Sequence, residues 1–488
     1  MIVIGGGLAG LAAGVGLAEA GCRVRLFEQR PFLGGRASSY VLPDGEHIDN
    51  CQHVTLGCCT NLADFYNRVG AANKITFFNR LLFLDPQGRR GVMQAGLLPA
   101  PFHMLGSFAA FAPLTFRDKL SIARAMLNIL RHRGHPPELA AGSPISMLDW
   151  LRRRGQTQSA IDRFWRVVLV SALDEELDKT DAHYGIDVFW KGFLSNGTGY
   201  RMGIPSVPLA NLYGGCRIAI HQKGGEVILR SPARGVRIDG SACTGMEFDE
   251  GREETADAYV LAVPHSKIAD LLPAEVVQAE PAFRDLKHLT DAPITGVHLW
   301  FDREVLTEPF ITLLDTHTQW IFNKSARFDS ASKNVGDHWN TQDPAAASAT
   351  TQYLQLVISA SYDLLQEPRQ NIIDLCLAEV RQAIPAARTA NLLKATVIKE
   401  AAATFSPVPG VDRWRPAQRS PIAGLFLAGD WTATGWPATM EGAVRSGYLA
   451  AEAVLASGGT PKTLLQPDLP PDGLVTLWAR PRRGSGQR

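Results

Sequence analysis

The sequence has no excess of charge of either sign. Its 488 residues include 49 lysines and arginines against 48 aspartates and glutamates, a formal net charge of +1. Nucleic-acid-binding proteins normally carry a basic face, so nothing in this balance indicates a nucleic-acid partner. Long-range electrostatics are therefore a poor guide to what the protein binds.

Cysteine is scarce and lacks paired spacing. Seven cysteines are scattered along the chain, and the one cluster, Cys51, Cys58 and Cys59, contains no CxxC pair. This usage argues against a disulfide framework and fits a reducing compartment. Because adjacent cysteines rarely bind one metal with good geometry, we interpret the cluster as small buried side chains and expect no metal site.

The sequence also lacks an unbroken hydrophobic run long enough to cross a membrane. Its longest uncharged stretch, residues 91–116, is interrupted by Pro99, Pro101 and Pro113, and proline breaks a continuous helix. The chain starts directly on the strand-like Ile2–Ile4, so we expect no signal peptide and a cytoplasmic protein, with peripheral contact at the inner face of the cell membrane left open.

What is present begins with a glycine-rich turn. The apolar run Ile2–Ile4 leads into Gly5, Gly7 and Gly10 in GxGxxG spacing, and residues 11–20 then have the pattern of a helix of small apolar residues. In a dinucleotide-binding turn the first glycine permits the turn, the second lets the backbone approach a pyrophosphate, and the third lets helix and strand pack closely. The helix N-terminus, at Leu8-Ala9, offers amide groups to the phosphates.

An acidic residue follows at the expected distance. Residues 22–27 alternate like a second strand, and Glu28 ends it, about 20 residues after the glycine turn. A carboxylate in this position accepts hydrogen bonds from the adenosine ribose. A lone GxGxxG is a weak signal, but strand, glycines, helix, strand and acid in this order indicate a nucleotide site.

Gly34, Gly35 and Arg36 come shortly after Glu28. With them the sequence resembles the FAD-binding amine oxidase and phytoene desaturase superfamily, whose signature continues from the acid into Gly-Gly-Arg. The resemblance implies FAD as the cofactor, with Arg36 along its pyrophosphate. No second GxGxxG is present, since Met202 stands where a third glycine would be needed, so a separate NADPH domain is not expected.

A second half of the site is expected near the other end of the chain. Residues 425–428 form an apolar run into Gly429 and Asp430, and a helix is expected from Met440 to about residue 455. By resemblance, Asp430 contacts the ribitol and the pyrophosphate. The backbone amides of the helix start would face the flavin N1–C2=O edge, where a helix N-terminus stabilises negative charge; these are the amides of Met440, Glu441 and Ala443.

Three more strands are expected between the two motifs, at residues 226–229, 234–238 and 258–263. The resemblance places the backbone of Val236 on the adenine. Together the segments predict an α/β fold: a Rossmann-like FAD-binding domain of the glutathione-reductase type and a discontinuous α+β substrate-binding domain. The predicted bounds are 1–90, 214–290 and 405–458 for the first, 91–213 and 291–404 for the second, and 459–488 for a flexible tail rich in proline and glycine.

The first insert contains a helix pattern at residues 117–133. Leu120, Ala123, Leu127 and Leu130 recur at helical spacing with basic residues around them. The pattern fits a surface that dips into a membrane, or a helix whose apolar side faces the core and whose basic side faces water. We favour the second interpretation.

Two further stretches narrow the resemblance. Residues 49–61 and 429–443, together with Gly34-Gly35-Arg36-Ala37-Ser38-Ser39, closely resemble the hydroxysqualene dehydroxylases of bacterial hopanoid synthesis, and the likeness extends to about residue 455. Cys51 departs from the pattern, where glycine is expected; its side chain would crowd the flavin side of the pocket or fill a gap. The resemblance implies replacement of the allylic hydroxyl of hydroxysqualene by hydrogen to give squalene, using reduced FAD, an unidentified electron donor and an apolar tunnel.

The acid for that reaction is the weakest part of the prediction. His53 is the first candidate, because histidine can donate a proton near neutral pH, and Asp49 could orient it or bind FAD. A histidine packed in the core or against the flavin is the alternative, and we favour it. Tyr200 and Asp174 are further candidates without a spacing argument.

Three functions therefore stay open. The first is the dehydroxylase, which the two stretches favour. The second is a carotenoid-type desaturase or isomerase that uses oxidised FAD on a polyprenyl hydrocarbon. The third is a flavin-binding scaffold without activity.

Overall fold

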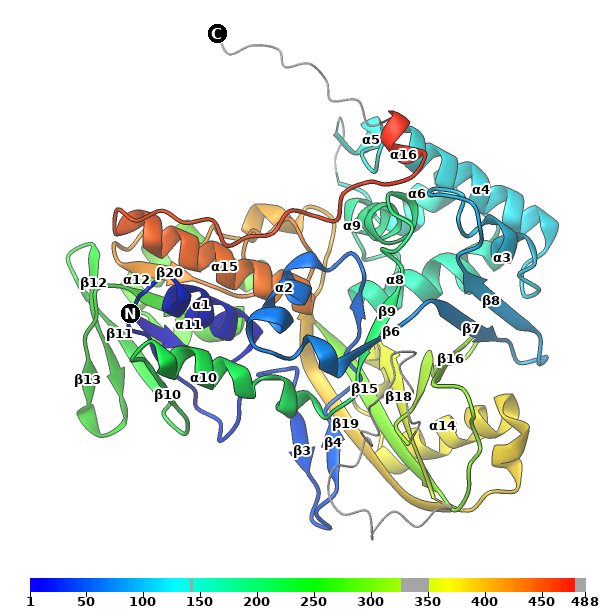
Figure 1. The fold of residues 1–488 in the computed structure, drawn as a ribbon, viewed down its shortest axis with the longest axis horizontal. Coiled ribbons are helices and arrows are strands. Elements are labelled where there is room, and N and C mark those ends of the chain that lie inside the picture. Colours follow the sequence, from blue (N-terminus) through cyan, green and yellow to red (C-terminus); the bar gives the residue numbers. More distant parts are fainter. Residues whose placement is uncertain (141–143, 326–350, 479–488) are drawn as a thin grey trace.

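The computed structural model describes residues 1–140, 144–325 and 351–478. A small parallel sheet with its helices forms one side of the molecule, and a larger sheet with a layer of helices forms the other (Figure 1). This architecture confirms the predicted α/β class. Within the described ranges, no helix is both long and apolar enough to cross a membrane.

The parallel sheet joins segments from the start, the middle and the end of the chain. Its strand order is β10-β2-β1-β14-β20, all pairs parallel. The strands are β10 (Glu226–Ile228), β2 (Arg25–Phe27), β1 (Ile2–Ile4), β14 (Tyr259–Leu261) and β20 (Leu425–Leu427). Each lies inside a segment that the sequence predicts to be a strand, from an apolar run or, for β2, from an alternating pattern.

Both faces of this sheet are covered, which is why its three central-to-edge strands β1, β14 and β20 are apolar throughout, while β2 and β10 each begin with one charged residue, Arg25 and Glu226. Val3 and Leu26 point into a cluster with three helices on one face, while Ile4 and Phe27 point into a cluster that includes a three-stranded antiparallel sheet on the other. The helices are α1 (Leu8–Glu19), α10 (Gly214–Gln222) and α15 (Met440–Ser457), and the antiparallel strands are β11 (Ala233–Asp239), β12 (Ala242–Phe248) and β13 (Glu253–Glu254). Helix α15 approaches α1 so closely that a Cβ on Gly447 would lie 2.3 Å from the carbonyl oxygen of Ala9.

The larger sheet has seven strands in the order β19-β15-β18-β17-β16-β7-β8. They are β19 (Leu392–Phe405), β15 (Asp291–Phe301), β18 (Gln352–Ser359), β17 (Trp320–Asn323), β16 (Phe310–Leu313), β7 (Arg80–Leu84) and β8 (Arg90–Gln94). Strand β7 pairs in parallel with β16, so the chain enters this sheet at Arg80, ahead of the boundary at residue 90 expected from the sequence.

Side chains alternate between the two faces of the larger sheet. Ile321 and Leu356 pack toward α14 (Arg369–Ala383) in one cluster. Their neighbours Phe322 and Val357 point to the opposite face and belong to the main core cluster. That opposite face is turned toward the helical layer.

The helical layer is built from residues 105–194. It contains α3 (Leu105–Ala109), α4 (Phe116–Arg131), α5 (Pro137–Ala140), α6 (Met147–Arg153), α7 (Gln158–Ala160), α8 (Arg166–Leu173) and α9 (Ala182–Phe189), with π-helical turns at Ile161–Trp165 and Trp190–Leu194. Thr115 and Asp118 form a capping box that starts α4.

Shorter elements connect the two halves of the molecule. They are the hairpin β3 (Ser39–Val41) and β4 (His47–Asp49), helix α2 (Thr60–Arg68), the sheet of β5 (Thr55–Leu56), β9 (Met202–Pro205) and β6 (Ile75–Phe78), and helices α11 (His265–Leu271), α12 (Ala274–Ala279) and α13 (Pro281–Arg284).

Residues 459–478, the first part of the segment expected to be a flexible tail, have a defined path in the structure. The segment runs over α15 and ends in α16 (Val475–Trp478) beside the helical layer (Figure 1). Its proline and glycine content prevents long regular structure, but polar side chains elsewhere satisfy its backbone: Glu452 accepts the amide hydrogens of Leu464 and Leu465 at 2.6 and 2.8 Å. Residues 479–488 of the predicted tail lie outside the described residues.

Candidate functional site

The glycine turn lies between β1 and α1, at the carboxyl end of the parallel sheet. Gly5 has φ +109°, and a Cβ on it would lie 2.4 Å from the carbonyl oxygen of Ala262 on the next strand segment. A Cβ on Gly10 would lie 1.9 Å from the carbonyl oxygen of Gly5. These two glycines are thus needed by the protein itself, as the predicted turn requires.

Gly7 differs from the other two. It precedes α1 with extended backbone (φ −74°), and the nearest atom to a Cβ there is the Cα of Gly35 at 3.8 Å. The protein therefore has room for a side chain at Gly7. The open space beside Gly7 adjoins the first backbone amides of α1, those of Leu8 and Ala9. First-turn amides have no partner inside a helix and are suited to bind phosphate.

Glu28 stands at the end of β2, next to this turn. It is buried, and its two carboxylate oxygens accept hydrogen bonds from the amides of Gly6 (2.6 Å) and Arg30 (2.7 Å). The amides hold the carboxylate at the edge of the glycine turn, where the sequence expects the adenosine ribose.

Gly35 and Arg36 connect the N-terminal and C-terminal motifs. Gly35 has φ +60°, and a Cβ there would meet the Cα of Gly7 at 3.0 Å, while the amide of Gly34 donates to the carbonyl of Gly6 at 2.8 Å. The guanidinium of Arg36 binds the Asp430 carboxylate at 2.6 Å. Two motifs that are 394 residues apart in the sequence thus meet at one place.

The C-terminal motif supplies a second helix start. Gly429 and Asp430 follow β20, and α15 begins at Met440 with Thr439 as its cap, whose Oγ1 accepts the amide hydrogen of Gly442 at 3.0 Å. The amide of Ala443 donates to the Thr439 carbonyl at 2.9 Å, so of the three amides expected at the flavin, this one already has a backbone partner.

Val236 lies at the centre of β11, paired with Met246 of β12, and is buried. Glu28 is instead bonded to a residue that precedes β11: the amide of Ser231 donates to the Glu28 carbonyl at 3.0 Å. Contact between the Val236 backbone and the adenine stays a prediction.

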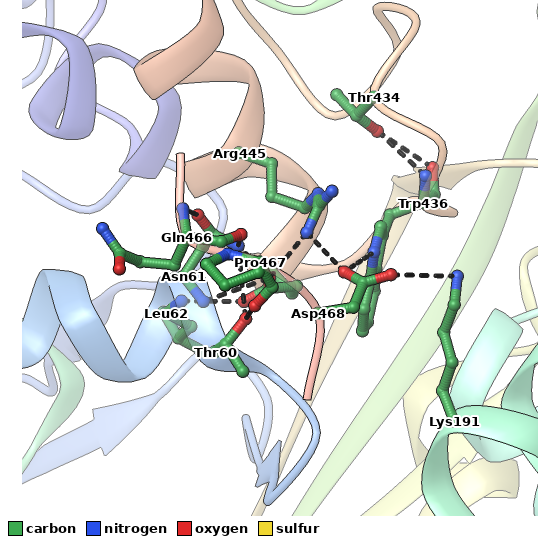
Figure 2. Close-up of polar contacts among 12 residues, drawn as sticks. Thr60, Asn61, Leu62, Lys191, Thr434, Trp436, Arg445, Gln466, Pro467 and Asp468 are labelled. Atoms are coloured by element: carbon green, nitrogen blue, oxygen red, sulfur yellow. Dashed lines mark hydrogen bonds and ion pairs between the residues drawn. The ribbon is translucent and has the colours of Figure 1, made fainter. Parts of the chain in front are cut away.

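The Glu441 side chain has a role that the sequence did not indicate. Its carboxylate is buried and accepts the Leu62 amide at 2.7 Å and the Asn61 side-chain amide at 2.9 Å, which fixes the start of α2 against α15. Asn61 also holds the C-terminal segment, since its side chain exchanges two hydrogen bonds with the backbone of Gln466, at 2.8 and 3.1 Å (Figure 2).

Asp468 fastens the same segment to the loop before α15. Its carboxylate lies between Arg445 (2.8 Å), the indole NH of Trp436 (3.3 Å) and Lys191 (3.9 Å) of the helical layer (Figure 2). The segment thus braces Trp436, the residue that borders the cavity described below.

Replacing Asn61 by alanine should lower the free energy of unfolding by about 1–3 kcal/mol, because Glu441 and Gln466 would keep buried polar groups without their partner. Urea denaturation would measure this change. Asn371, which bonds to Glu367 on the surface, provides the control, and its replacement by alanine should change stability by at most about 0.5 kcal/mol. Equal stability of the Asn61 variant and the wild type would contradict this account.

A cavity of about 540 Å³ lies between the larger sheet and the helical layer. One end is bordered by Gln52 and by the segment from Trp436 to Glu441, which includes the start of α15, and the other by residues of α3 and α4. The lining is mainly apolar and comes from Leu81, Phe83, Met93, Met104, Phe108, Phe164, Val167, Val168, Ala172, Phe189, Phe193, Trp320, Phe322 and Val357, among others. The π-helical turns contribute Phe164 and Phe193, and such turns often occur at functional sites.

A buried ion pair lies beside the end of the cavity that Gln52 and the start of α15 border; we call this the cofactor end. Lys324 Nζ lies 2.9 Å from Asp49 Oδ2 and 2.9 Å from Gln52 Oε1, and both charged side chains are almost completely buried. Burial alone would raise the pKa of Asp49, but Lys324, the Leu209 amide and the Ser39 hydroxyl outweigh it and hold the pKa below its ordinary value. Asp49 is therefore a fixed negative charge that positions Lys324.

His53, the first candidate for a catalytic acid, lies outside the cavity lining. Its Nδ1 lies 3.0 Å from the carbonyl oxygen of Cys51, and the neighbouring Gln52 and Val54 border the cavity. Burial lowers the pKa of His53, so the ring is neutral at physiological pH and poorly suited to donate a proton. Burial likewise raises the pKa of the Cys51 thiol to about 12, so this cysteine stays protonated.

The two remaining candidates are engaged in structural contacts. Tyr200 borders the cavity, but its hydroxyl donates to the Asn79 carbonyl and accepts the Ala95 amide hydrogen, both at 3.0 Å. Asp174 accepts from the Ala360 amide and the Thr404 hydroxyl, at 2.8 and 3.0 Å, and burial raises its pKa. Asp174 lies outside the cavity lining.

Arg415 is a second residue that the sequence did not indicate. Its buried guanidinium donates to the carbonyls of Asp430 (2.9 Å), Thr432 (2.6 Å) and Trp436 (2.8 Å), and so shapes the loop between β20 and α15. Arg415 also pairs with the Asp412 carboxylate at 2.8 Å and donates to the hydroxyl of Thr434 at 3.0 Å. The carbonyl groups that it holds in the loop leave no pattern in the sequence.

The residues present fit FAD. The open space at Gly7, the amides at the starts of α1 and α15, the carboxylate of Glu28 and the Arg36–Asp430 pair lie along one edge of the parallel sheet. Such an edge is where doubly wound sheets bind dinucleotides. In this arrangement Gly7 would leave room for the backbone to approach the cofactor. A side chain at Gly5, Gly10, Gly34, Gly35 or Gly429 would instead meet atoms of the protein itself.

Comparison with known proteins agrees with this reading. Residues 8–455 match the model of the family described as flavin containing amine oxidoreductase. The zeta-carotene desaturase of Synechocystis is 29% identical over 93% of this chain and 97% of its own, and the 15-cis-phytoene desaturase of Solanum lycopersicum is 27% identical over 93% and 77%. An oxidoreductase structure from Methanosarcina mazei has a TM-score of 0.69 at 17% identity, covering 93% of this chain and 99% of that one.

These relatives confirm FAD as the cofactor and correct the expected reaction. The prediction of reductive dehydroxylation of hydroxysqualene is wrong, because relatives that match nearly the full length of this chain are named as carotene and phytoene desaturases. The stretches that suggested a dehydroxylase, residues 49–61 and 429–443, lie beside the expected cofactor site and also contribute to the cavity lining, through residues that include Gln52, Val54, Trp436 and Met440.

Proposed function

Because this chain belongs to the flavin containing amine oxidoreductase family and is an FAD-dependent oxidoreductase, we propose that it is a desaturase of the carotenoid type that acts on a polyprenyl hydrocarbon. The observation that carries the proposal is the cavity of about 540 Å³, which leads from the start of α15 to α3 and α4 between mainly apolar walls. A long hydrocarbon without polar groups is the ligand that such walls bind best.

The state of the charged groups on the cavity wall supports a hydrocarbon over an amine. Asp187 is paired with Lys191 at 2.7 Å, and Glu441 is occupied by the start of α2. A charged amine would be stabilised by a carboxylate that has no cation of its own, whereas Lys191 already neutralises Asp187 through Oδ2, although Asp187 Oδ1 accepts no hydrogen bond from the described residues. The names of the full-length relatives point in the same direction.

Desaturation removes two hydrogens from neighbouring carbons, one with the bonding electron pair and one as a proton. Bound FAD would supply the two-electron oxidant for this step. The hydrocarbon would lie in the apolar cavity, away from bulk water. The amides of Met440 and Glu441 at the start of α15 would stabilise negative charge at the flavin edge. Gln52, fixed by Lys324, is a polar group beside the cofactor end.

The test is an anaerobic single turnover with the oxidised holoprotein. Phytoene or zeta-carotene in detergent should bleach the flavin absorbance, and extracts should contain one new double bond per flavin reduced. A bound flavin that stays oxidised with both substrates, while the hydrocarbon is recovered unchanged, would overturn the proposal. A changed double-bond geometry without net flavin reduction would favour the isomerase.

Filling the cavity should block this reaction. Ala172 lies on the cavity wall in α8, and Ala172→Trp should slow bleaching by more than about ten-fold, since overpacking a formed site costs roughly 1–3 kcal/mol. Flavin content should not change, because the residue is remote from the glycine turn. Ala279, exposed at the end of α12, provides a matched tryptophan control. Normal bleaching by Ala172→Trp would show that substrate does not use this cavity.

A further inference from the structure

Helix α4 has two apolar sides. The prediction that Leu120, Ala123, Leu127 and Leu130 face the core is wrong for the first three, which are exposed, whereas Leu130 is buried. The core side of the helix is formed mainly by Ile122, Ala125 and Ile129. The helix contains both stripes in one sequence, so periodicity alone could not tell which of them is buried. Phe116, 82% exposed, continues the outer stripe by one turn.

An apolar loop lies next to this stripe. A hydrogen bond of 2.6 Å from the Gly96 amide to the His103 carbonyl closes the loop, and its tip carries Leu97, Leu98 and Phe102. Leu97 is fully exposed, and the other two are 51% and 40% exposed. Exposing three large apolar side chains on one short loop has no benefit in water, and exposed patches of this kind mark binding surfaces.

The loop and the outer stripe surround the open end of the cavity. Phe102, Leu105, Ala123 and Leu127 are partly or fully exposed and also border the cavity. We call this region the α3–α4 apolar surface, formed by Leu97, Leu98, Phe102, Leu105, Phe116, Leu120, Ala123 and Leu127. In Figure 1 the two helices lie at one end of the molecule, away from the parallel sheet.

The segment that carries most of this surface, residues 91–137, has almost only positive charges. Residues 91–137 contain Arg117, Lys119, Arg124, Arg131 and Arg133 but a single acid, Asp118. That acid is buried, because it caps α4 through Thr115. The exposed rim therefore complements a negatively charged partner, although the whole chain has a net charge of only +1.

We propose that the α3–α4 apolar surface inserts into one leaflet of a membrane that contains anionic lipids. The leucine and phenylalanine side chains enter the hydrocarbon, and the basic residues contact the lipid headgroups. Helix α16 extends the surface: Leu477 is 69% exposed, and the Leu474 amide bonds to the Ala100 carbonyl at 2.8 Å. Given the proposed function, a hydrocarbon would pass from the lipid into the cavity without crossing water.

Vesicle flotation of the holoprotein without substrate tests this proposal. The wild type should float with vesicles of phosphatidylcholine and phosphatidylglycerol, and less with phosphatidylcholine alone or at high salt. Leu97→Ser combined with Leu98→Ser should weaken binding at least about ten-fold, because each leucine loses its transfer into hydrocarbon. Arg117→Gln with Arg124→Gln should weaken binding to the anionic vesicles on the order of ten-fold, and should make it less sensitive to salt.

Leu393 provides the control, since it is 57% exposed on strand β19 of the larger sheet; Leu393→Ser should bind vesicles like the wild type. Absence of wild-type binding, or equal binding of the Leu97/Leu98 variant, would overturn the proposal. So would a dimer in gel filtration that the Leu97/Leu98 variant abolishes, because a second copy would then cover the surface. Bleaching by detergent-solubilised substrate is measured separately, so the proposed function can stand when this inference fails.

Discussion

Gly7→Ala is expected to yield a folded protein that no longer retains FAD. The added methyl group meets no atom of the protein within 3.8 Å, and alanine adopts the extended backbone found at Gly7 without strain. The space it fills is the one through which the backbone approaches the pyrophosphate. Overpacking of this kind costs roughly 1–3 kcal/mol or more, which weakens binding by about 5–150-fold.

The measurement is the flavin absorbance per protein after purification, followed by titration of the apoprotein with FAD. Gly214 offers a matched control, because it also stands at a helix start, in α10, with open space around its Cβ position. Gly214→Ala should bind FAD normally. Normal FAD affinity of Gly7→Ala would mean that the cofactor does not approach the glycine turn as proposed.

Lys324→Met is expected to lower the free energy of unfolding at neutral pH by about 3–5 kcal/mol. The substitution leaves the carboxylate of Asp49 buried without its cation, and removing one partner of a buried ion pair is more costly than replacing both. Chemical denaturation of the holoprotein at pH 7 would measure the loss. The double variant Lys324→Met, Asp49→Asn should recover part of it.

The pH dependence gives a second check with a defined sign. In the wild type the pKa of Asp49 is lowered, so its contribution to stability is fully present above the unfolded value of about 3.9 and is lost as pH falls through the folded value. In Lys324→Met the cation is gone, and burial should raise the pKa of Asp49. Protonation of Asp49 as pH falls then removes the unpaired buried charge, which reduces the loss of unfolding free energy in the variant. The stability difference between the two proteins should therefore shrink in acid.

Lys267→Met serves as the surface control, because Lys267 pairs with Asp270 with both side chains more than 60% exposed; exposed pairs contribute about 0–1 kcal/mol. If Lys324→Met were as stable as this control at pH 7, the Asp49–Lys324 pair would not support the cofactor end of the cavity.

The FAD-binding half was predictable because its chemistry is local. Gly5, Gly10 and Glu28 occur within one strand–helix–strand segment, and the steric limits that demand glycine there act between neighbouring parts of the chain. The apolar runs at Ile2–Ile4 and Leu425–Leu427 likewise mark strands that are buried on both faces. These signals fixed the α/β class and the cofactor without any knowledge of which strand pairs with which.

The polar residues around the cavity were less predictable, because their environment comes from distant segments. The sequence drew attention to His53, but burial and a backbone contact make it neutral and place it outside the cavity. Lys324 was not predicted to belong to the site, because its partner Asp49 is 275 residues away in the chain. Glu441 was expected only for its amide, and its side chain proved to hold α2.

The sequence by itself thus determined the nucleotide cradle, the strands of the parallel sheet and the identity of FAD, because each depends on residues close together in the chain. Only the tertiary structure decided the path of the cavity, the charge state of its polar groups and which stripe of α4 faces water. Those properties depend on burial, and burial is set by how the sheet, the helical layer and the C-terminal segment pack against one another.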